Sequence, residues 1–396
     1  MEFSARLDAK CRKPLPQRFL DFRTPVGSGR DLVLITGATG HVGSCTLVRL
    51  LGAGHYVRAA VRSEAKIAAI LARPDIRALN PGSRLTFTIV PNISTQGAYD
   101  HAVEGVTQII HIASPLATGN SVPAERHNDF FIGPAVQGTL NLLEAANMVG
   151  TVRRVVITSS IVALVPHDEM EGNVKRSPSN PISPNDRIPF VPGPYKDTFA
   201  AYAASKVVSL YHAEVFMARK RPAFDAVYLH PGFVLGRNDT ALTPGQAIQG
   251  TNSVVLALLL GKRFGPYAGT TVHVEDVARA HVMSLDPSVC GNQSYILSQN
   301  SRWNDACEIT RSCFPEAVKN KMLVMGGNVK TTHLPVDTTL TEETFGFEFA
   351  SYEEQVRSII SQYLELRTQS KAPVYSEGEA SFKAREVCLS IPTSAC

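Results

Sequence analysis

Tyr202 and Lys206 form a Tyr-x-x-x-Lys pair at the start of a stretch with helical apolar spacing. On a helix, residues four apart lie on the same face, so the phenol and the ammonium would be neighbours. A nearby ammonium favours phenolate and would lower the pKa of the tyrosine. A tyrosine tuned in this way can give a proton to a substrate oxygen as a general acid. Such pairs also arise by chance on helices, so the interpretation depends on the surrounding motifs.

Two serines, Ser159 and Ser160, follow an apolar run at residues 154–158. Hydroxyls at the carboxyl end of a central strand point into the ligand crevice of a parallel sheet. One of them could hold a substrate oxygen beside the tyrosine. The alternative is a serine pair that only caps a turn. Alternation along a strand shows that the two side chains face opposite ways, without showing which one is catalytic.

A glycine-rich turn follows the apolar run at residues 32–35, and residues 36–43 read TGATGHVG. Glycine permits backbone angles closed to other residues and lets a ligand approach the backbone. The helix expected from about Val42 would direct its free N–H groups and positive dipole end at a diphosphate. A dinucleotide cofactor is therefore expected, although such turns can also serve packing alone. The residues expected to contact it here are Gly37, Thr39, Gly40, His41, Val42 and Gly43.

The end of the second expected strand, residues 56–61, indicates which dinucleotide binds. An NAD site usually has an acidic residue near this point, about twenty residues after the turn. This chain has Arg62 there, with Lys66 one helical turn later. A guanidinium attracts a 2′-phosphate that a carboxylate would repel. The alternative is a solvated pair partly neutralised by Glu64, but the position favours NADP(H).

The bulk properties exclude several classes of protein. The chain has 396 residues and a formal net charge of +4, which suggests neither a nucleic-acid partner nor a membrane surface. No apolar run reaches transmembrane length. The seven cysteines are scattered, without Cys-x-x-Cys or zinc spacing, so we expect no metal site. A reducing compartment, the cytoplasm, is the simplest expectation.

Apolar strands alternate with helical stretches, which predicts an α/β fold with a Rossmann-type, doubly wound parallel sheet. Strands are expected at 32–35, 56–61, 85–90, 108–112, 154–158 and 226–229, and helices at 135–148 and 247–260. After Pro231 the pattern loosens, which suggests a smaller C-terminal substrate lobe built from discontinuous segments. The expected divisions are an N-terminal extension at 1–30, an NADP-binding domain with the catalytic residues at 31–235, mainly the substrate lobe at 236–370 with 272–300 returning to the core, and a polar tail at 371–396.

Residues 165–197 interrupt the pattern with seven prolines. A loop of this length is usually functional or disordered. It leaves the strand that precedes Ser160 and returns to the helix that carries Tyr202. We therefore expect it to form one wall of a substrate pocket.

Together the motifs resemble the extended branch of the short-chain dehydrogenase/reductase superfamily, in the group of dihydroflavonol, cinnamoyl-CoA and yeast-type aldehyde/ketone reductases. The resemblance covers about residues 31–370. Further matching stretches are Val61-Arg62-Ser63, 110–115 (IHIASP), Gly138-Thr139, 155–160, 230–236 (HPGFVLG) and 272–281. It implies that Ser160, Tyr202 and Lys206 are catalytic, and that His111, His273 and His281 are structural. It also implies cofactor contacts from Asn92, Ile93, Ala113, Pro115, Ser159, Tyr202, Lys206, Pro231, Phe233 and Val234.

Two features depart from the pattern of that group. Asn92 stands where an aspartate usually contacts adenine, and the interval from Ser160 to Tyr202 is longer than usual. The substrate therefore cannot be transferred from the resemblance.

The resemblance implies an NADPH-dependent reductase that transfers a hydride to a ketone or aldehyde of medium size, aromatic or from secondary metabolism. Its partner would be that small-molecule carbonyl compound, with no nucleic acid or membrane, and the protein would be a monomer or homodimer. One alternative is a nucleotide-sugar epimerase or dehydratase, which would typically carry an acid in place of Arg62. Another is a non-catalytic NADP(H) sensor, which would usually lack Tyr202 or Lys206.

Overall fold

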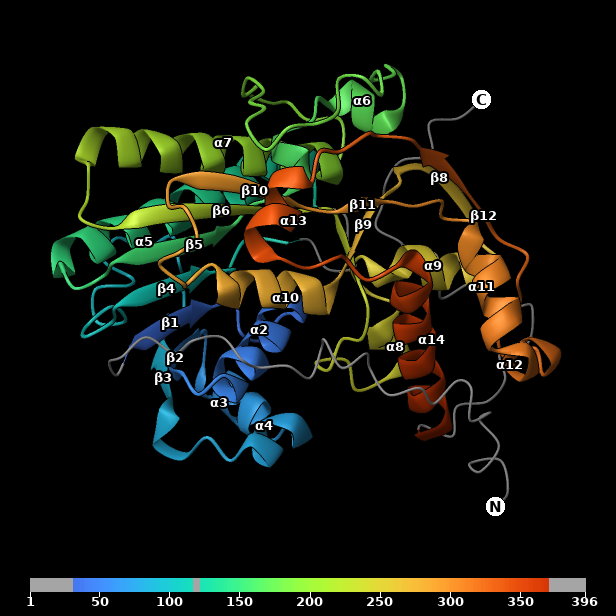
Figure 1. Ribbon diagram of the computed structural model, residues 1–396, viewed down its shortest axis with the longest axis horizontal. Helices are drawn as coiled ribbons and strands as arrows, with labels where there is room; N and C mark the ends of the chain where they lie inside the picture. The colour runs from blue at the N-terminus through green and yellow to red at the C-terminus, as the bar shows by residue number, and fades with distance from the viewer. Residues whose placement is uncertain (1–30, 117–121, 370–396) are drawn as a thin grey trace.

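The computed structural model describes residues 31–116 and 122–369 (Figure 1). The expected N-terminal extension and polar tail lie outside the described residues. Within those residues, no helix has the length and apolar character needed to cross a bilayer.

A seven-stranded sheet in the order β10-β6-β5-β4-β1-β2-β3 forms the centre of the molecule, and every neighbouring pair is parallel. Its strands are β1 (Leu32–Thr36), β2 (Tyr56–Val61), β3 (Leu85–Ile89), β4 (Gln108–His111), β5 (Arg154–Thr158), β6 (Asp225–Pro231) and β10 (Gln293–Leu297). Near-continuous apolar runs such as β1 and β5 suit strands covered on both faces. The predicted doubly wound α/β fold is confirmed. Of the seven strands in this sheet, the edge strand β10 was not predicted from the sequence.

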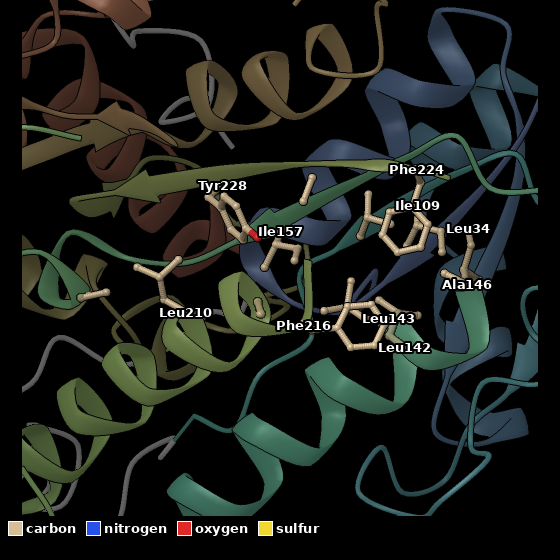
Figure 2. Packing of buried hydrophobic residues seen from close by; sticks show 14 of the residues in the cluster. Leu34, Ile109, Leu142, Leu143, Ala146, Ile157, Leu210, Phe216, Phe224 and Tyr228 are labelled. Atoms are coloured by element: carbon tan, nitrogen blue, oxygen red, sulfur yellow. The ribbon is translucent and has the colours of Figure 1, made fainter. Parts of the chain in front are cut away.

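Helices cover both faces of this sheet (Figure 1). The helices between β1 and β6 are α2 (His41–Gly52), α3 (Glu64–Leu71), α4 (Pro74–Leu79), α5 (Gly133–Val149), α6 (His167–Glu171) and α7 (Thr198–Lys220), with short turns η2 (Gly82–Arg84), η3 (Ala124–Arg126), η5 (Ile161–Ala163) and the π-helical η4 (Asn128–Ile132). Helices α5 and α7 pack on one face, where Leu142 and Phe216 meet Ile109 and Ile157 of the strands (Figure 2). Helix α2 packs on the other face beside α10 (Val274–Met283).

The C-terminal part has its own core, built around the apolar helix α9 and the buried Trp303. Its helices are α8 (Pro244–Ala247), α9 (Asn252–Leu259), α11 (Asp305–Cys313), α12 (Pro315–Lys319) and α14 (Tyr352–Gln369), while α13 (Thr339–Phe345) packs by β10. Two small sheets accompany them, formed by β7 (Phe233–Leu235), β9 (Thr270–His273) and β11 (Gln299–Asn300), and by β8 (Arg263–Ala268) with β12 (Asn328–Thr332). The helix predicted at 247–260 forms only at 252–259, as α9. Its predicted start is wrong, because α8 ends at Ala247 and the chain turns at Gly250, which has a φ of +66°.

The strand order reverses between β1 and β4, which is the switch point where doubly wound sheets bind ligands. Thr36 at the end of β1 is in register with His111, and His111 is in register with Ile157 of β5. The segments after these three strands therefore meet at one edge of the sheet.

Candidate active site

Helix α7 places Tyr202 and Lys206 within its first turns. The helix begins at a defined point because the Asp197 carboxylate accepts a hydrogen bond from the Ala200 N–H at 2.7 Å. The Lys206 side chain is buried, and its Nζ donates to the backbone oxygen of Thr158 at 3.3 Å. The same nitrogen lies 5.9 Å from the centre of the Tyr202 ring.

Ser160 lies next to Tyr202, although 41 residues separate them in the chain. The side chain of Ser160 lies close enough to the tyrosine hydroxyl to lower its pKa. Ser160 also begins the short turn η5, and its Oγ accepts a hydrogen bond from the Val162 N–H at 3.4 Å. The structure thus joins two of the predicted catalytic residues directly and places the third, Lys206, beside them.

Burial controls the acidity of this group. It raises the pKa of Tyr202, and the hydrogen bond from Ser160 offsets only part of that rise. The expected lowering of the tyrosine pKa by Lys206 is therefore wrong for this structure, because removal from water penalises the phenolate more. Burial also lowers the pKa of Lys206 to about 8. A neutral, protonated Tyr202 is the form that can donate a proton.

A cleft opens beside Lys206 at the carboxyl ends of β4 and β5. Its lining residues are His111, Ala113, Ser114, Thr139, Ile157, Thr158, Ser159, Lys206, Ser209 and Leu210. Three of the predicted cofactor residues, Ala113, Ser159 and Lys206, thus share one wall. The buried Oγ of Ser159 has no hydrogen-bond partner among the described residues. A buried hydroxyl without a partner is costly, so this atom suits a polar group of a ligand in the cleft.

The glycine turn tests whether a dinucleotide fits. Gly37 has a φ of +75°, and a Cβ there would lie 2.8 Å from the backbone nitrogen of Ala113. A Cβ at Gly43 would lie 2.1 Å from the Gly37 oxygen, so helix α2 packs on the turn with no space for a side chain. Gly40 is different, because it is exposed and a Cβ there would meet only the Gly37 oxygen at an ordinary 3.5 Å. Its open face is the side from which a ligand can approach.

The start of α2 also suits an anion. Its N-cap residue, Gly40, gives no side-chain cap, and no acidic residue lies in the first turn. Backbone N–H groups at such an end attract a diphosphate. His41 begins the helix, and its Nε2 lies 3.0 Å from the Arg237 backbone oxygen. Burial lowers the pKa of His41 to about 4. The cradle therefore fits a dinucleotide through its backbone rather than through charged side chains.

The remaining predicted cofactor residues occupy neighbouring strand ends. Arg62 follows β2 and Lys66 lies in α3, and both are exposed. This exposure agrees with a phosphate site and equally with a solvated pair. The Oδ1 of Asn92 accepts a hydrogen bond from the Ser94 N–H at 2.9 Å, which leaves its amide NH₂ for another partner. Ile93 packs against Gly138, where a Cβ would lie 2.7 Å from its Cδ1.

The predicted residues near β6 and β7 are more deeply placed. Pro231 ends β6 and is buried, and Pro115 after β4 is buried as well. Val234 is 8% exposed and packs in the α2-side core, which leaves its side chain little surface for a cofactor. The ring centre of Phe233 lies 5.2 Å from that of Trp303, so Phe233 belongs to an aromatic cluster of the C-terminal part.

Sequence reasoning missed two threonines at the strand ends. The Oγ1 of Thr36 accepts from the N–H groups of Ile112 and Ala113, at 3.1 and 3.0 Å, and lies 2.9 Å from His111 Nδ1. The Oγ1 of Thr158 lies 2.6 Å from His281 Nε2. The signal was available, since each threonine ends an apolar strand directly before a predicted site residue.

The comparisons with known proteins give the class. The model of the "NAD dependent epimerase/dehydratase family" matches residues 33–296, and the chain belongs to this family, which is part of the extended short-chain dehydrogenases/reductases. The chain is 40% identical over 349 residues to the ketoreductase CTB6 of Cercospora nicotianae, covering 85% of this chain and 96% of that protein. It is 34% identical over 299 residues to aldehyde reductase 2 of Sporidiobolus salmonicolor, covering 74% of this chain and 82% of that protein.

Solved structures agree with the fold. The yeast methylglyoxal/isovaleraldehyde reductase Gre2, solved with NADPH, superposes with a TM-score of 0.71 at 21% identity. The match covers 85% of this chain and 99% of that one.

Proposed function

We propose that this protein is an NADPH-dependent carbonyl reductase that converts a ketone or aldehyde to an alcohol. One observation carries the proposal: Ser160, a protonated Tyr202 and Lys206 lie together at the carboxyl ends of the central strands, with Lys206 Nζ 5.9 Å from the centre of the Tyr202 ring. The relatives named as a ketoreductase and an aldehyde reductase support an oxidoreductase with a small-molecule carbonyl substrate.

The roles of the three residues follow from their geometry. When bound, NADPH supplies the hydride that adds to the carbonyl carbon. The Tyr202 hydroxyl donates its proton to the carbonyl oxygen, since burial keeps the phenol protonated at neutral pH. The Ser160 hydroxyl donates a hydrogen bond to the same oxygen and stabilises the negative charge that develops there. Lys206 places a positive charge near the phenol, which would stabilise the phenolate left after proton transfer, although burial keeps the pKa of the resting phenol raised.

The cofactor is proposed to be NADP(H). Arg62 stands at the end of β2, where its guanidinium is free to face a 2′-phosphate. The Gre2 structures contain NADPH, which supports the same cofactor class. Ser159, with its unpartnered hydroxyl, and Lys206 would meet the nicotinamide end, and the glycine turn would meet the diphosphate.

The substrate is proposed to be of medium size and aromatic, or a product of secondary metabolism. The loop 165–197 is proposed as a wall of its pocket, because Arg187 of the loop pairs with Glu214 of α7, the helix that carries Tyr202. A cytoplasmic location and a monomer or homodimer complete the proposal.

The rival function within the family is epimerisation or dehydration of a nucleotide sugar. Such enzymes hold NAD tightly, and their β2 typically ends with an acid. The exposed Arg62 at that point argues against this activity. A non-catalytic sensor is disfavoured because such proteins usually lack the tyrosine or the lysine, and here Ser160, Tyr202 and Lys206 are all present and lie together.

Steady-state NADPH oxidation over a panel of aromatic and aliphatic ketones and aldehydes tests the proposal. We expect turnover with at least one carbonyl class, and a higher kcat/KM with NADPH than with NADH. Conversion of UDP-glucose without net NADPH consumption, together with no carbonyl reduction, would favour the rival instead.

A further inference from the structure

A continuous series of hydrogen bonds leads from the loop 165–197 to Ser160. The Nη2 of Arg187 donates to Ser294 Oγ at 3.0 Å. That Oγ lies 3.1 Å from His230 Nε2, and His230 Nδ1 lies 3.3 Å from the backbone oxygen of Ser160. The path thus joins the loop, strand β10, strand β6 and Ser160, which lies two residues after the end of β5.

Only one arrangement of protons satisfies every member of this path. A guanidinium can only donate and a carbonyl can only accept. Ser294 therefore accepts from Arg187 and gives its own proton to His230 Nε2, and the His230 Nδ1–H donates to Ser160. This needs a neutral imidazole, and burial lowers the pKa of His230 to about 3. The Ser160 oxygen thereby requires the proton on Nδ1, and the Ser294 hydroxyl, held by Arg187, is the donor that Nε2 needs in that tautomer.

Arg187 is itself held in place. Its Nε and Nη2 meet the Glu214 carboxylate at 2.9 and 2.6 Å, and its Nη1 donates to the Pro184 backbone oxygen at 2.9 Å. Glu214 lies on α7. A fork that binds both carboxylate and hydroxyl is a geometry that arginine can supply and lysine cannot.

The inner end of the path bears directly on the site. The Ser160 backbone oxygen already accepts from the Ala163 N–H at 3.0 Å, and His230 provides a second donor on it. Two donors on one carbonyl restrain the peptide that follows Ser160, and with it the turn whose Val162 N–H holds the Ser160 Oγ at 3.4 Å. A hydroxyl held in one direction is worth more in the transition state than one that must reorient.

We propose that Arg187 is a positioning residue for the reaction: through Ser294 and His230 it holds Ser160 in the orientation that binds the carbonyl oxygen. The proposal rests on the proposed reductase function. The loop 165–197 would then have two roles. It would hold Ser160 in place through Arg187, and it would form one wall of the substrate pocket.

Substitutions at the middle of the path separate positioning from loop anchoring. Ser294→Ala cuts the path but leaves the Arg187–Glu214 pair intact, and Ser294→Thr keeps the hydroxyl. We expect Ser294→Ala to lower kcat about fivefold, the scale of one net hydrogen bond, with the KM for the carbonyl and the NADPH Kd within about twofold. Ser294→Thr should restore kcat to within about twofold of the wild type.

A double-mutant cycle tests whether the members act together. Arg187→Met should lower kcat about as much as Ser294→Ala, and the double variant should lose no more than either single one, since both cut the same path. Arg176→Met is the matched control, because Arg176 anchors the same loop through Glu169 and Asp186 without reaching Ser294. Additive losses, an unchanged kcat in Ser294→Ala, or an equal loss in Arg176→Met would overturn the positioning role.

The protonated nitrogen of His230 gives a readout that needs no turnover. In ¹⁵N spectra of histidine-labelled protein, assigned by the signal missing in His230→Gln, the wild type should show a protonated Nδ1 and an unprotonated Nε2. Ser294→Ala should keep the proton on Nδ1, because the Ser160 oxygen can only accept, but should shift the Nε2 resonance as that nitrogen loses its hydrogen-bond donor. A wild-type His230 protonated on Nε2 would overturn the inference even if carbonyls are reduced. Absence of carbonyl reduction with the expected tautomer would overturn the proposed function, and the two failures are therefore distinguishable.

Discussion

The two ends of the candidate site are built in different ways. At the glycine turn the backbone provides the surface, and Gly37 and Gly43 are needed because any side chain would collide with main-chain atoms. At the other end the working groups are buried side chains, Ser160, Tyr202 and Lys206, each tied to a neighbour by hydrogen bonds or close contact. Substitutions that add atoms should therefore impair the glycine turn, and substitutions that remove atoms should impair the group of Ser160, Tyr202 and Lys206.

Removal of one oxygen at the side-chain end should have the largest effect. Tyr202→Phe is expected to lower kcat by about 100-fold or more, because the proton donor is lost. Its NADPH Kd, measured by fluorescence titration, should stay within about threefold of the wild type, since the turn is untouched. Tyr211→Phe is the matched control, an exposed tyrosine on the same helix. A Tyr202→Phe enzyme that retains a third of the wild-type turnover would remove Tyr202 from this role.

A charge reversal at the cofactor end should change selectivity rather than chemistry. Arg62→Asp is expected to lower kcat/KM for NADPH by about tenfold or more and to leave that for NADH nearly unchanged, because the acid repels a 2′-phosphate. Arg219→Asp makes the same charge change at the far end of α7. Equal losses with both cofactors would show that Arg62 does not meet the 2′-phosphate.

Two alanines in the glycine turn should separate ligand binding from folding. The methyl group of Gly40→Ala would meet no close atom in the free protein, so the Tm of this variant should be unchanged. NADPH should bind about tenfold more weakly, because the methyl group occupies the open face of the turn. Gly43→Ala collides with the Gly37 oxygen, so its Tm should fall by about 5 °C or more. Calorimetry and NADPH titration of both variants check the pair, and a stable Gly43→Ala protein would mean that α2 can move away from the turn.

The smallest expected effect is a rise in Tm when the buried ammonium of Lys206 is removed. Lys206 has a pKa of about 8 in the fold against about 10.4 in the unfolded chain, so the unfolded chain binds more protons between these values. Stability of the wild type should therefore rise with pH from about 8 to 10. Lys206→Met should lack this rise and have a Tm about 3 °C higher at pH 7, while losing activity. A Tm difference that does not shrink above pH 8 would contradict a buried charged lysine.

Much of the sheet could be predicted because its strands are buried on both faces and read as apolar runs. The edge strand β10 was harder, since Gln293, Ser294 and Tyr295 mix polar and aromatic residues in five positions. The helix predicted at 247–260 begins five residues later than expected, at Asn252, because the chain turns at Gly250 in a left-handed conformation. Patterns of hydrophobicity do not report such a turn.

The candidate site, too, could be predicted from the sequence only in part. Motif spacing was enough to pair Tyr202 with Lys206, because residues four apart lie on one helix face, whereas the choice of Ser160 over Ser159 needed the family resemblance. The acidity of Tyr202 was not predictable, since it depends on how completely the surrounding segments exclude water. The path from Arg187 to Ser160 was also out of reach, because Ser294 and Arg187 are 107 residues apart and meet only through the sheet order.

The most direct measurement follows the hydride itself. NADPH carrying deuterium at both C4 positions of the nicotinamide should be incubated with the enzyme and the carbonyl compound that gives the highest kcat/KM, and the product examined by NMR and mass spectrometry. We expect one deuterium on the carbinol carbon, a single configuration at that carbon, and none of this product with Tyr202→Phe above about 1% of the wild-type rate. Oxidation of the cofactor without deuterium in the alcohol, or return of the label to the cofactor after epimerisation of a sugar, would contradict a carbonyl reductase.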